Sequence, residues 1–445
     1  MRDSHLKFLR FLLRLLARAI IARYNPGIVG ITGSVGKTSA KEAVKTVLGH
    51  DRRVRAPSKS FNNEVGLPLT IIGEWETTGG VLFWFKVFAK GLSQLVIKNR
   101  SYPEILVLEY GVDHPGDMSY LLKIARPHVG VFTALGEVPV HVEFFTGADA
   151  VLREKARLIT ALPVTGFAIL SADEPGIAAL RSETRAHVLT FGFSDRADLR
   201  ISNLSNRFEG GAVVPRSSDN ETIGGASFKL TYGGSVIPVR LSGGLGRAPA
   251  LASAVGAAAG LIFGMNLVTI AEALSRFEPA PGRFHIIRGM KQSTLIDDTY
   301  NASPVAVREA LETLRSIRGK RKIAVLGDML EIGKYTLSAH EAVGRLAGGV
   351  VDFLVTVGLR GKFIAESAVR AGLSKRSVAS FTNVAEAAHF LQEKLQKGDI
   401  VLLKASQGVR MEKVVKEIMA EPARAPELLV RQNAEWLAKP GLYDE

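Results

Sequence analysis

The chain has 445 residues, of which 47% are hydrophobic, with no cysteine and a formal net charge of +14. Its composition excludes disordered and collagen-like chains, and its length predicts two or three domains, each with its own core. The absence of cysteine excludes disulfide bonds, zinc–thiolate and iron–sulfur sites and a cysteine nucleophile. The positive charge comes without an RNA-binding motif or a run of five like charges, so we expect no nucleic acid partner; a nucleic-acid-dependent ATPase would rest on charge alone.

Residues 6–24 predict an amphipathic helix at the N-terminus. At 100° per residue, Lys7, Arg10, Arg14 and Arg18 fall within one arc, and most of the leucines lie on the opposite side. A helix that crossed a bilayer would bury these cations, and no signal-peptide cleavage site follows. The pattern favours either a helix lying in an anionic membrane surface or a helix docked on its own domain.

A second apolar stretch, VLFWFKVFAKGLSQLVI, covers residues 81–97 and contains Lys86 and Lys90 one helical turn apart. Seventeen residues with two lysines make a poor membrane span. Two interpretations remain, a second interfacial helix and a helix that covers the sheet of the first domain.

Residues 27–48 (GIVGITGSVGKTSAKEAVKTVL) predict a strand, a glycine-rich turn and a helix. Glycines in such a turn let backbone amides face a phosphate, Lys37 can reach the terminal phosphates, and Thr38 can ligate magnesium. The spacing departs from the common phosphate loop because five residues, rather than four, separate Gly30 from the Gly-Lys pair. The predicted phosphate-binding residues are Gly33, Ser34, Val35, Gly36, Lys37, Thr38 and Ser39.

This variant loop, TGSVGKT, resembles that of the Mur ligases, ATP-dependent enzymes that form amide bonds in peptidoglycan precursors. Further stretches follow in the order and approximate spacing of the members that add D-alanyl-D-alanine. They are SFNNEVGLPLTII (60–72), VLEYGVDHPGDM (107–118), a His-Val-Glu cluster (141–143) followed by EKARLI (154–159), PGRF (281–284), DDTYNASP (297–304) and VLGDMLEIGKYTLSAH (325–340). The resemblance covers roughly residues 27–415.

The resemblance implies a ligase that uses ATP and Mg²⁺ to phosphorylate a muramoyl-peptide carboxylate and then joins the acyl phosphate to D-alanyl-D-alanine. By the same resemblance, Thr38 and Glu109 would hold the first magnesium ion and His141 the second. Lys155 is similar to the family lysine that carries a carbamate, which would bridge the metals. Lys37, Lys155 and His141 would therefore be catalytic, together with one arginine from the C-terminal part.

That arginine is Arg283, which by resemblance would reach the phosphates when the domains close. Asp298 would hydrogen-bond the ribose, and Tyr300 and Asn301 would flank the nucleotide, whereas Asp297 is expected to serve only the end of its strand.

Asn62 and Asn63 would contact the muramoyl-peptide, although turn formation explains them equally well. Asp328 and His340 lie in a stretch that the family uses for the incoming amine, and we expect no direct role for either residue.

The order of patterns predicts an α/β fold with three parts. An amphipathic helix (1–26) precedes a central ATP-binding domain (27–280) with a mostly parallel sheet, and a Rossmann-like C-terminal domain (281–445) follows. Within the central domain, residues 194–244 predict a small antiparallel excursion and residues 248–276 an Ala-rich helical closure.

Two departures from the family pattern leave alternatives open. The phosphate loop begins near residue 30, so we expect the usual N-terminal uridine-nucleotide-binding domain to be missing. The loop at residues 245–249 lacks the family's His-Asn pair. The alternatives are an amino-acid or polyglutamate ligase and a membrane-associated nucleotide-binding protein that has lost ligation. In either case we expect a cytoplasmic monomer, peripheral on the inner face of the membrane if residues 6–24 bind lipid.

Overall fold

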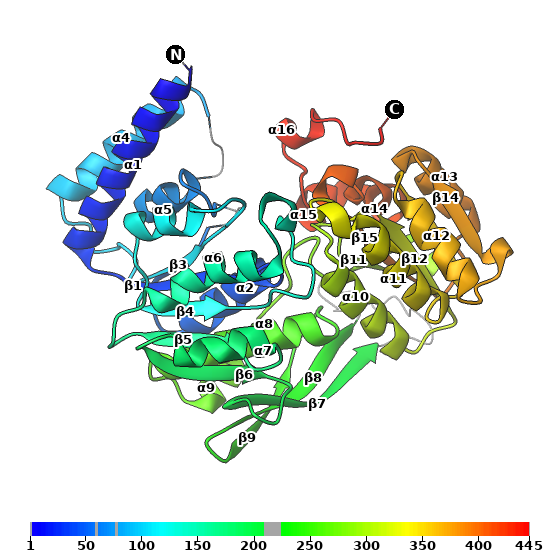
Figure 1. Ribbon diagram of the computed structural model, residues 1–445, viewed down its shortest axis with the longest axis horizontal. Helices are drawn as coiled ribbons and strands as arrows, with labels where there is room; N and C mark the ends of the chain where they lie inside the picture. The colour runs from blue at the N-terminus through cyan, green and yellow to red at the C-terminus, as the bar shows by residue number, and fades with distance from the viewer. Residues whose placement is uncertain (1, 58–60, 76–78, 209–223, 445) are drawn as a thin grey trace.

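The computed structural model describes residues 2–57, 61–75, 79–208 and 224–444, and it contains two sheets in two lobes (Figure 1). The larger sheet has nine strands in the order β2-β3-β1-β4-β5-β6-β7-β8-β9. The smaller has six, in the order β10-β11-β15-β12-β13-β14. The predicted α/β fold class is confirmed, and the domain boundaries at residues 26 and 280 stay predictions.

Strands β2 to β7 of the large sheet pair in parallel, and β7, β8 and β9 pair antiparallel. The expected antiparallel section is therefore present, as a continuation of the parallel sheet. Residues 209–223 of this section lie outside the described residues, and so does Ser60, the first residue of the motif at 60–72. The strands are β1 (Gly27–Thr32), β2 (Val54–Arg55), β3 (Ile105–Glu109), β4 (Val129–Phe132), β5 (Phe167–Ser171), β6 (His187–Gly192), β7 (Leu199–Phe208), β8 (Gly224–Tyr232) and β9 (Ser235–Arg240).

Helices cover both faces of this sheet, so its central strands read as continuous apolar runs. One face packs against α2 (Lys37–Leu48), α8 (Arg247–Ile262) and α9 (Leu267–Leu274). The other packs against α3 (Gly66–Ile72), α5 (Asp117–Ile124), α6 (Ala148–Thr160) and α7 (Pro175–Ala178). The helical closure expected at 248–276 is two helices, because the chain leaves helical geometry after Ile262 and restarts at Leu267 with the Asn266 side chain as N-cap.

The smaller sheet is parallel except for β10, which runs antiparallel to β11. Its strands are β10 (His285–Arg288), β11 (Thr294–Asp297), β12 (Arg321–Gly327), β13 (Phe353–Val357), β14 (Val378–Phe381) and β15 (Asp399–Lys404). One face carries α10 (Pro304–Ser316), α11 (Thr336–Gly348) and α12 (Gly361–Arg370), and the other carries α13 (Val384–Lys394) and α14 (Glu412–Ile418). Two short helices, α15 (Ala425–Leu428) and α16 (Ala434–Leu437), end the chain. A single hydrophobic cluster continues from α6 and β5 of the first lobe into α10 and α11 of the second.

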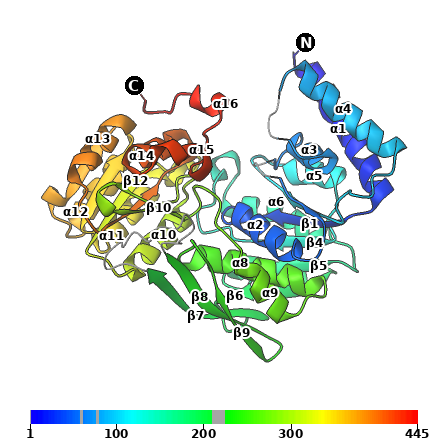
Figure 2. The same ribbon diagram turned by 180° about the vertical axis from the view of Figure 1, so that it is seen from behind.

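Helices α1 (Arg2–Tyr24) and α4 (Val81–Val96) lie side by side at the outer edge of the first lobe (Figures 1 and 2). The apolar face of α1 is docked on its own domain, because Leu13, Leu16 and Ile20 are buried in a cluster with α3 and α5. Helix α4 packs on α1 and α3 rather than over the sheet, so the expectation of a sheet-covering helix at 81–97 is wrong. No helix in the described part of the chain is long and apolar enough to cross a membrane.

Gly91 allows α1 and α4 to approach each other closely. A Cβ atom at this position would lie 2.5 Å from Leu16 Cδ2. We therefore expect Gly91→Leu to destabilise the protein by about 1–3 kcal/mol through overpacking, despite the better helix propensity of leucine. Urea unfolding checks this, with Ala89→Leu on the exposed side of the same helix as control. Equal unfolding midpoints for the two variants would contradict the packing argument.

Candidate active site

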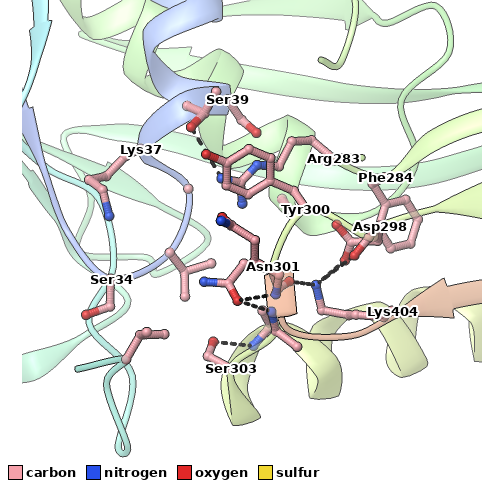
Figure 3. A pocket seen from close by; sticks show the side chains of 18 of the residues that line it. Ser34, Lys37, Ser39, Arg283, Phe284, Asp298, Tyr300, Asn301, Ser303 and Lys404 are labelled. Atoms are coloured by element: carbon pink, nitrogen blue, oxygen red, sulfur yellow. Dashed lines mark hydrogen bonds and ion pairs between the residues drawn. The ribbon is translucent and has the colours of Figure 1, made fainter. Parts of the chain in front are cut away.

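A pocket of about 530 Å³ lies between the two lobes and is lined by residues from both. It collects almost every residue that the sequence singled out. The pocket-lining members of that set are Ser34, Val35, Gly36, Lys37, Thr38, Ser39, Asn62, Glu109, His141, Lys155, Arg283, Asp298, Tyr300 and Asn301. Figure 3 shows Ser34 and Lys37 on one side of this space and Arg283, Tyr300 and Asn301 on the other.

The phosphate loop connects β1 to the N-terminus of α2, as the sequence predicted. Gly33 has φ 144° and Gly36 has φ 85°, conformations that residues with a side chain rarely adopt. A Cβ atom on Gly33 would also lie 2.1 Å from Thr133 Oγ1, and that hydroxyl donates a 2.6 Å hydrogen bond to the carbonyl of Val35. The conformation of the loop is thus fixed by Thr133, directly after β4, as well as by its own glycines.

Lys37 begins α2 and is half-buried, with Nζ donating to the carbonyl of Gly33 at 2.7 Å. Burial lowers its pKa, the Glu109 carboxylate offsets this in part, and the nearby Arg283 guanidinium lowers the pKa further. Arg283 comes from the second lobe, stacks on the Tyr300 ring at 3.8 Å and donates to Thr38 Oγ1 at 3.3 Å. An arginine of one lobe therefore touches the phosphate loop of the other.

Glu109, at the end of β3, and Lys155, on α6, are both buried in the pocket wall. Burial, and then the positive charge of Lys37, lowers the pKa of Lys155 to about 7. The Glu109 carboxylate lies 3.2 Å from Lys41 Nζ, which also donates to the carbonyl of Pro57 at 2.6 Å. Neither Lys37 nor Lys155 forms an ion pair with any described residue, and the carboxylates near them offset their charges only in part.

His141 has φ 68° and stands between two carboxylates. Its Nε2 lies 3.3 Å from Asp113 of the first lobe and its Nδ1 lies 3.1 Å from Glu331 of the second. The imidazole holds the pKa of Glu331 below its ordinary value. In this arrangement His141 joins the lobes at the rim of the pocket.

Asp298 forms a 2.6 Å ion pair with Lys404 at the end of β15, and the same ammonium donates to the carbonyl of Asn301 at 2.9 Å (Figure 3). The neighbouring Asp297 is fully buried and accepts hydrogen bonds from the backbone of Gly282 and from Thr299. Burial raises its pKa to about 6. Asp297 thus ties the loop that carries Arg283 to the end of its strand, in agreement with the structural role expected for it.

The two asparagines predicted to contact substrate behave differently. Asn62 lines the pocket, and its backbone carbonyl accepts from Gly111 at 2.8 Å. The side chain of Asn63 accepts from Val65 and Gly66 at the start of α3, which is the turn-forming role.

Asp328 and His340 lie outside the pocket lining. The Asp328 carboxylate accepts from Arg360 and Gly361 backbone amides and from the Tyr443 hydroxyl. His340 is buried, and its Nε2 accepts from the Met329 amide. These contacts fix the loop after β12.

The loop that departs from the family pattern forms an apolar wall of the pocket, through Leu245, Ala248 and Pro249, with Phe277 beside them. Its one charged side chain, Arg247, turns away to stack on Phe193 at 3.8 Å and to pair with Asp173 at 3.2 Å.

The donor set fits a magnesium–nucleotide complex. Buried Ser34 Oγ and Arg283 Nε form no hydrogen bond with any described residue, and Glu109 Oε1 has only its 3.2 Å ion pair with Lys41; all three atoms belong to pocket-lining residues. Among the described residues there is no group of three His, Cys, Asp or Glu side chains that could hold a metal. Mg²⁺ does not require one, since it is commonly held by one or two carboxylates together with phosphate oxygens and water. Thr38 and Glu109 supply such a partial set.

Sequence reasoning missed the partners that these residues use. Lys404, Glu331, Asp113 and Lys41 hold Asp298, His141 and Glu109 in place. Lys404 ends the buried run DIVLLK, and a cation that closes an apolar strand is a signal that could have pointed to it. Lys41 lies one helical turn after Lys37, so it shares that face of α2.

Two family models match the chain: the Mur ligase middle domain over residues 89–231 and the Mur ligase glutamate ligase domain over residues 282–407. The chain is 30% identical over 436 residues to the UDP-N-acetylmuramoyl-tripeptide–D-alanyl-D-alanine ligase of Mycobacterium leprae, covering 92% of this chain and 77% of that protein. The corresponding enzyme of Bacillus subtilis is 29% identical, with 92% and 79% covered.

Among solved structures, the MurF ligase of Thermotoga maritima in complex with ADP superposes with a TM-score of 0.74 at 28% identity, covering 92% of this chain and 83% of that one. The FolC protein of Escherichia coli, in complex with ADP, has a TM-score of 0.58 at 16% identity, which shows a common fold alone. The fold, the phosphate loop and these matches agree, and the chain belongs to the Mur ligase family.

Proposed function

We propose that this protein is an ATP-dependent ligase of peptidoglycan precursor synthesis that adds D-alanyl-D-alanine to the carboxylate of a muramoyl-tripeptide. The observation that carries the proposal is the meeting of Lys37, the buried Lys155, Glu109 and an arginine from the opposite lobe in one pocket. The names of the relatives from Mycobacterium leprae and Bacillus subtilis supply the substrate pair.

The proposed reaction has two steps, and each is a nucleophilic substitution, first at phosphorus and then at the acyl carbon. A carboxylate oxygen of the peptide attacks the γ-phosphorus of ATP, the bond to ADP breaks, and an acyl phosphate forms. The amine of D-alanyl-D-alanine then attacks the acyl carbon, inorganic phosphate leaves, and the new amide loses one proton. Both steps bring anions together, so cations must offset their repulsion.

The chain's own residues divide this work. Lys37 and the loop amides hold the phosphates of ATP, and Arg283 reaches the transferred group from the second lobe. Asp298, Tyr300 and Asn301 line the adjoining wall for the nucleoside, and Asn62 faces the peptide. Thr38, Glu109, His141 and Lys155 are the proposed residues around Mg²⁺, which would supply further positive charge to the phosphate oxygens.

A carbamate on Lys155 belongs to the same proposal. The neutral amine is the form that reacts with carbon dioxide, and a pKa of about 7 leaves most of Lys155 neutral at pH 8. The product is an anion, which would relieve the repulsion from Lys37 and could join the metal ligands.

The proposed setting is a cytoplasmic monomer that uses ATP and Mg²⁺ and needs no nucleic acid. Two alternatives keep the same fold. An amino-acid or polyglutamate ligase would share the phosphate loop, and a protein that had lost ligation would keep only nucleotide binding. The retention of Lys155 and Arg283 in the pocket supports catalysis over binding alone.

Product mass decides among these candidates. The protein is incubated with ATP, Mg²⁺, bicarbonate, D-alanyl-D-alanine and UDP-N-acetylmuramoyl-tripeptide, and we expect an ATP-dependent mass gain of one dipeptide less water. Lys37→Ala should lower the rate by about 10²–10³-fold, because one preorganised cation is lost from the transferred phosphate. Lys45→Ala on the exposed side of α2 is the matched control. A folded, ATP-binding wild type that makes no product from this acceptor, or a Lys37→Ala protein as fast as wild type, would refute the proposal.

Lys155 gives a second prediction. In carbon-dioxide-depleted buffer at pH 8, we expect bicarbonate to raise the wild-type rate several-fold, while Lys155→Met stays at least about 10²-fold slower with or without bicarbonate. Below pH 7 the amine becomes protonated, so the bicarbonate effect should fade. Native mass spectrometry should show one bound carbon dioxide in the wild type only. A bicarbonate-independent wild-type rate would contradict the carbamate.

Arg283 gives a third. Arg283→Ala should lower kcat by on the order of 10³-fold with a smaller change in ATP affinity, because the guanidinium contributes chiefly to the transferred charge. Calorimetric ATP titration and steady-state rates separate the two effects. Arg276→Ala, an exposed arginine before the same loop, should leave both unchanged. Loss of ATP affinity with unchanged kcat would assign Arg283 to ground-state binding instead.

A further inference from the structure

Helix α4 exposes an apolar stripe along its whole length. Leu82, Phe85, Leu92 and Val96 follow one another at spacings of three, seven and four residues, which places them on one helical face. Their side chains are 76%, 71%, 57% and 79% exposed. The opposite face, through Val87 and Gly91, is the one that packs on the protein.

Helix α1 adds a second exposed apolar row beside it. Leu13, Leu16 and Ile20 are buried, yet Phe8 and Phe11 remain 61% and 43% exposed, and Leu15 is exposed as well. Large surface aromatics gathered on two adjacent helices differ from single exposed apolar residues, which are ordinary. The two helices thus have apolar side chains both on the side that packs on the protein and on the side that faces solvent. Hereafter the exposed residues are called the α1–α4 surface: Phe8, Phe11, Leu15, Leu82, Phe85, Leu92 and Val96.

The charged side chains described on α1 and α4 are all positive. The described side chains of α1 and α4 include no carboxylate. Some cations serve the fold: Arg10 pairs with Glu64 at 2.7 Å, and Arg14 stacks on Tyr120. Three others, Lys7, Arg18 and Lys86, are exposed and form no ion pair with any described residue.

The combination of exposed apolar side chains and free cations indicates what binds to the α1–α4 surface. Neither helix can cross a bilayer, so a transmembrane role does not explain the exposed aromatics. A second copy of the chain would bring one cationic surface against another, which like-charge repulsion opposes. An anionic lipid surface matches both features, because it accepts apolar side chains to the depth of its acyl boundary and attracts lysine and arginine.

We propose that α1 and α4 together dock the protein on an anionic lipid bilayer, with the α1–α4 surface inserted at the interface. The face that inserts is not the Leu13–Ile20 face that a helical wheel of α1 suggests, since that face is buried inside the protein. The inference is independent of the ligase chemistry, because it concerns helices outside the pocket lining.

The test is flotation of the full chain with vesicles of phosphatidylglycerol and phosphatidylcholine in equal amounts, compared with phosphatidylcholine alone. Removing α1 would expose a buried core, so point substitutions are the better probe. Phe85→Ser with Leu92→Ser removes apolar contact, and Arg18→Glu with Lys86→Glu reverses two free charges. The matched controls are Val268→Ser with Leu337→Ser, which are exposed elsewhere, and Lys375→Glu with Arg376→Glu, which changes net charge equally.

We expect binding to the anionic vesicles, with at least about tenfold weaker partitioning for each α1–α4 variant and native-like partitioning for each control. Thermal unfolding and ATP binding should stay as in the wild type, which separates lost docking from lost folding and from any failure of the proposed ligase activity. Absence of binding to anionic vesicles would overturn the proposal, as would equal losses in the controls. Self-association without lipid that the same substitutions abolish would assign the surface to a second copy instead.

Discussion

The pocket is built around an excess of positive charge. Lys37 and Lys155 each have a lowered pKa, neither forms an ion pair with a described residue, and the Glu109 carboxylate near Lys37 pairs with Lys41. Burying cations without anions is unfavourable unless a ligand brings the missing charge. A nucleoside triphosphate does so, and the tight glycine loop places amide dipoles where its phosphates would lie.

The contact between Arg283 of the second lobe and Thr38 of the first increases this excess of positive charge. Arg283 adds a further cation by touching Thr38, and it is held there by the Tyr300 ring and by the Asp297 carboxylate beneath its loop. His141 makes the complementary connection from the first lobe to Glu331. The continuous hydrophobic cluster between α6 and α10 supports both contacts. Residues whose positions are set by packing in the second lobe thus add to the positive charge of the pocket in the first.

Much of the fold and of the site was predictable from the sequence, and the parts that were not predicted were missed for identifiable physical reasons. The loop from Gly33 to Thr38 is a local pattern, so its strand, turn and helix follow from spacing alone. Lys404 is a neighbour of Asp298 because the paired strands β15 and β11 end at the same edge, and Glu331 meets His141 only because the two lobes come together there. The helical wheel of α1 correctly indicated Leu13, Leu16 and Ile20 as its apolar face, but it did not indicate that this face is covered by the protein's own α3, α4 and α5. For site residues such as Asn62, local geometry does not distinguish turn formation from substrate contact.

The loop that contains Asn62 and Glu64 both contacts α1 and lines the pocket, and this connects the two proposals physically. Arg10 of α1 holds Glu64, two residues after Asn62 in the loop that lines the pocket, and α3 begins directly after that loop. The half-exposed Arg10 side chain therefore joins α1 to a wall of the pocket, while Phe8, Phe11 and Leu15 take no part in that contact. Evolution of a lipid-binding face on such a helix requires changes only at outward positions, where substitutions cost little stability. Docking through the exposed side would therefore leave the Arg10–Glu64 contact with the pocket loop in place.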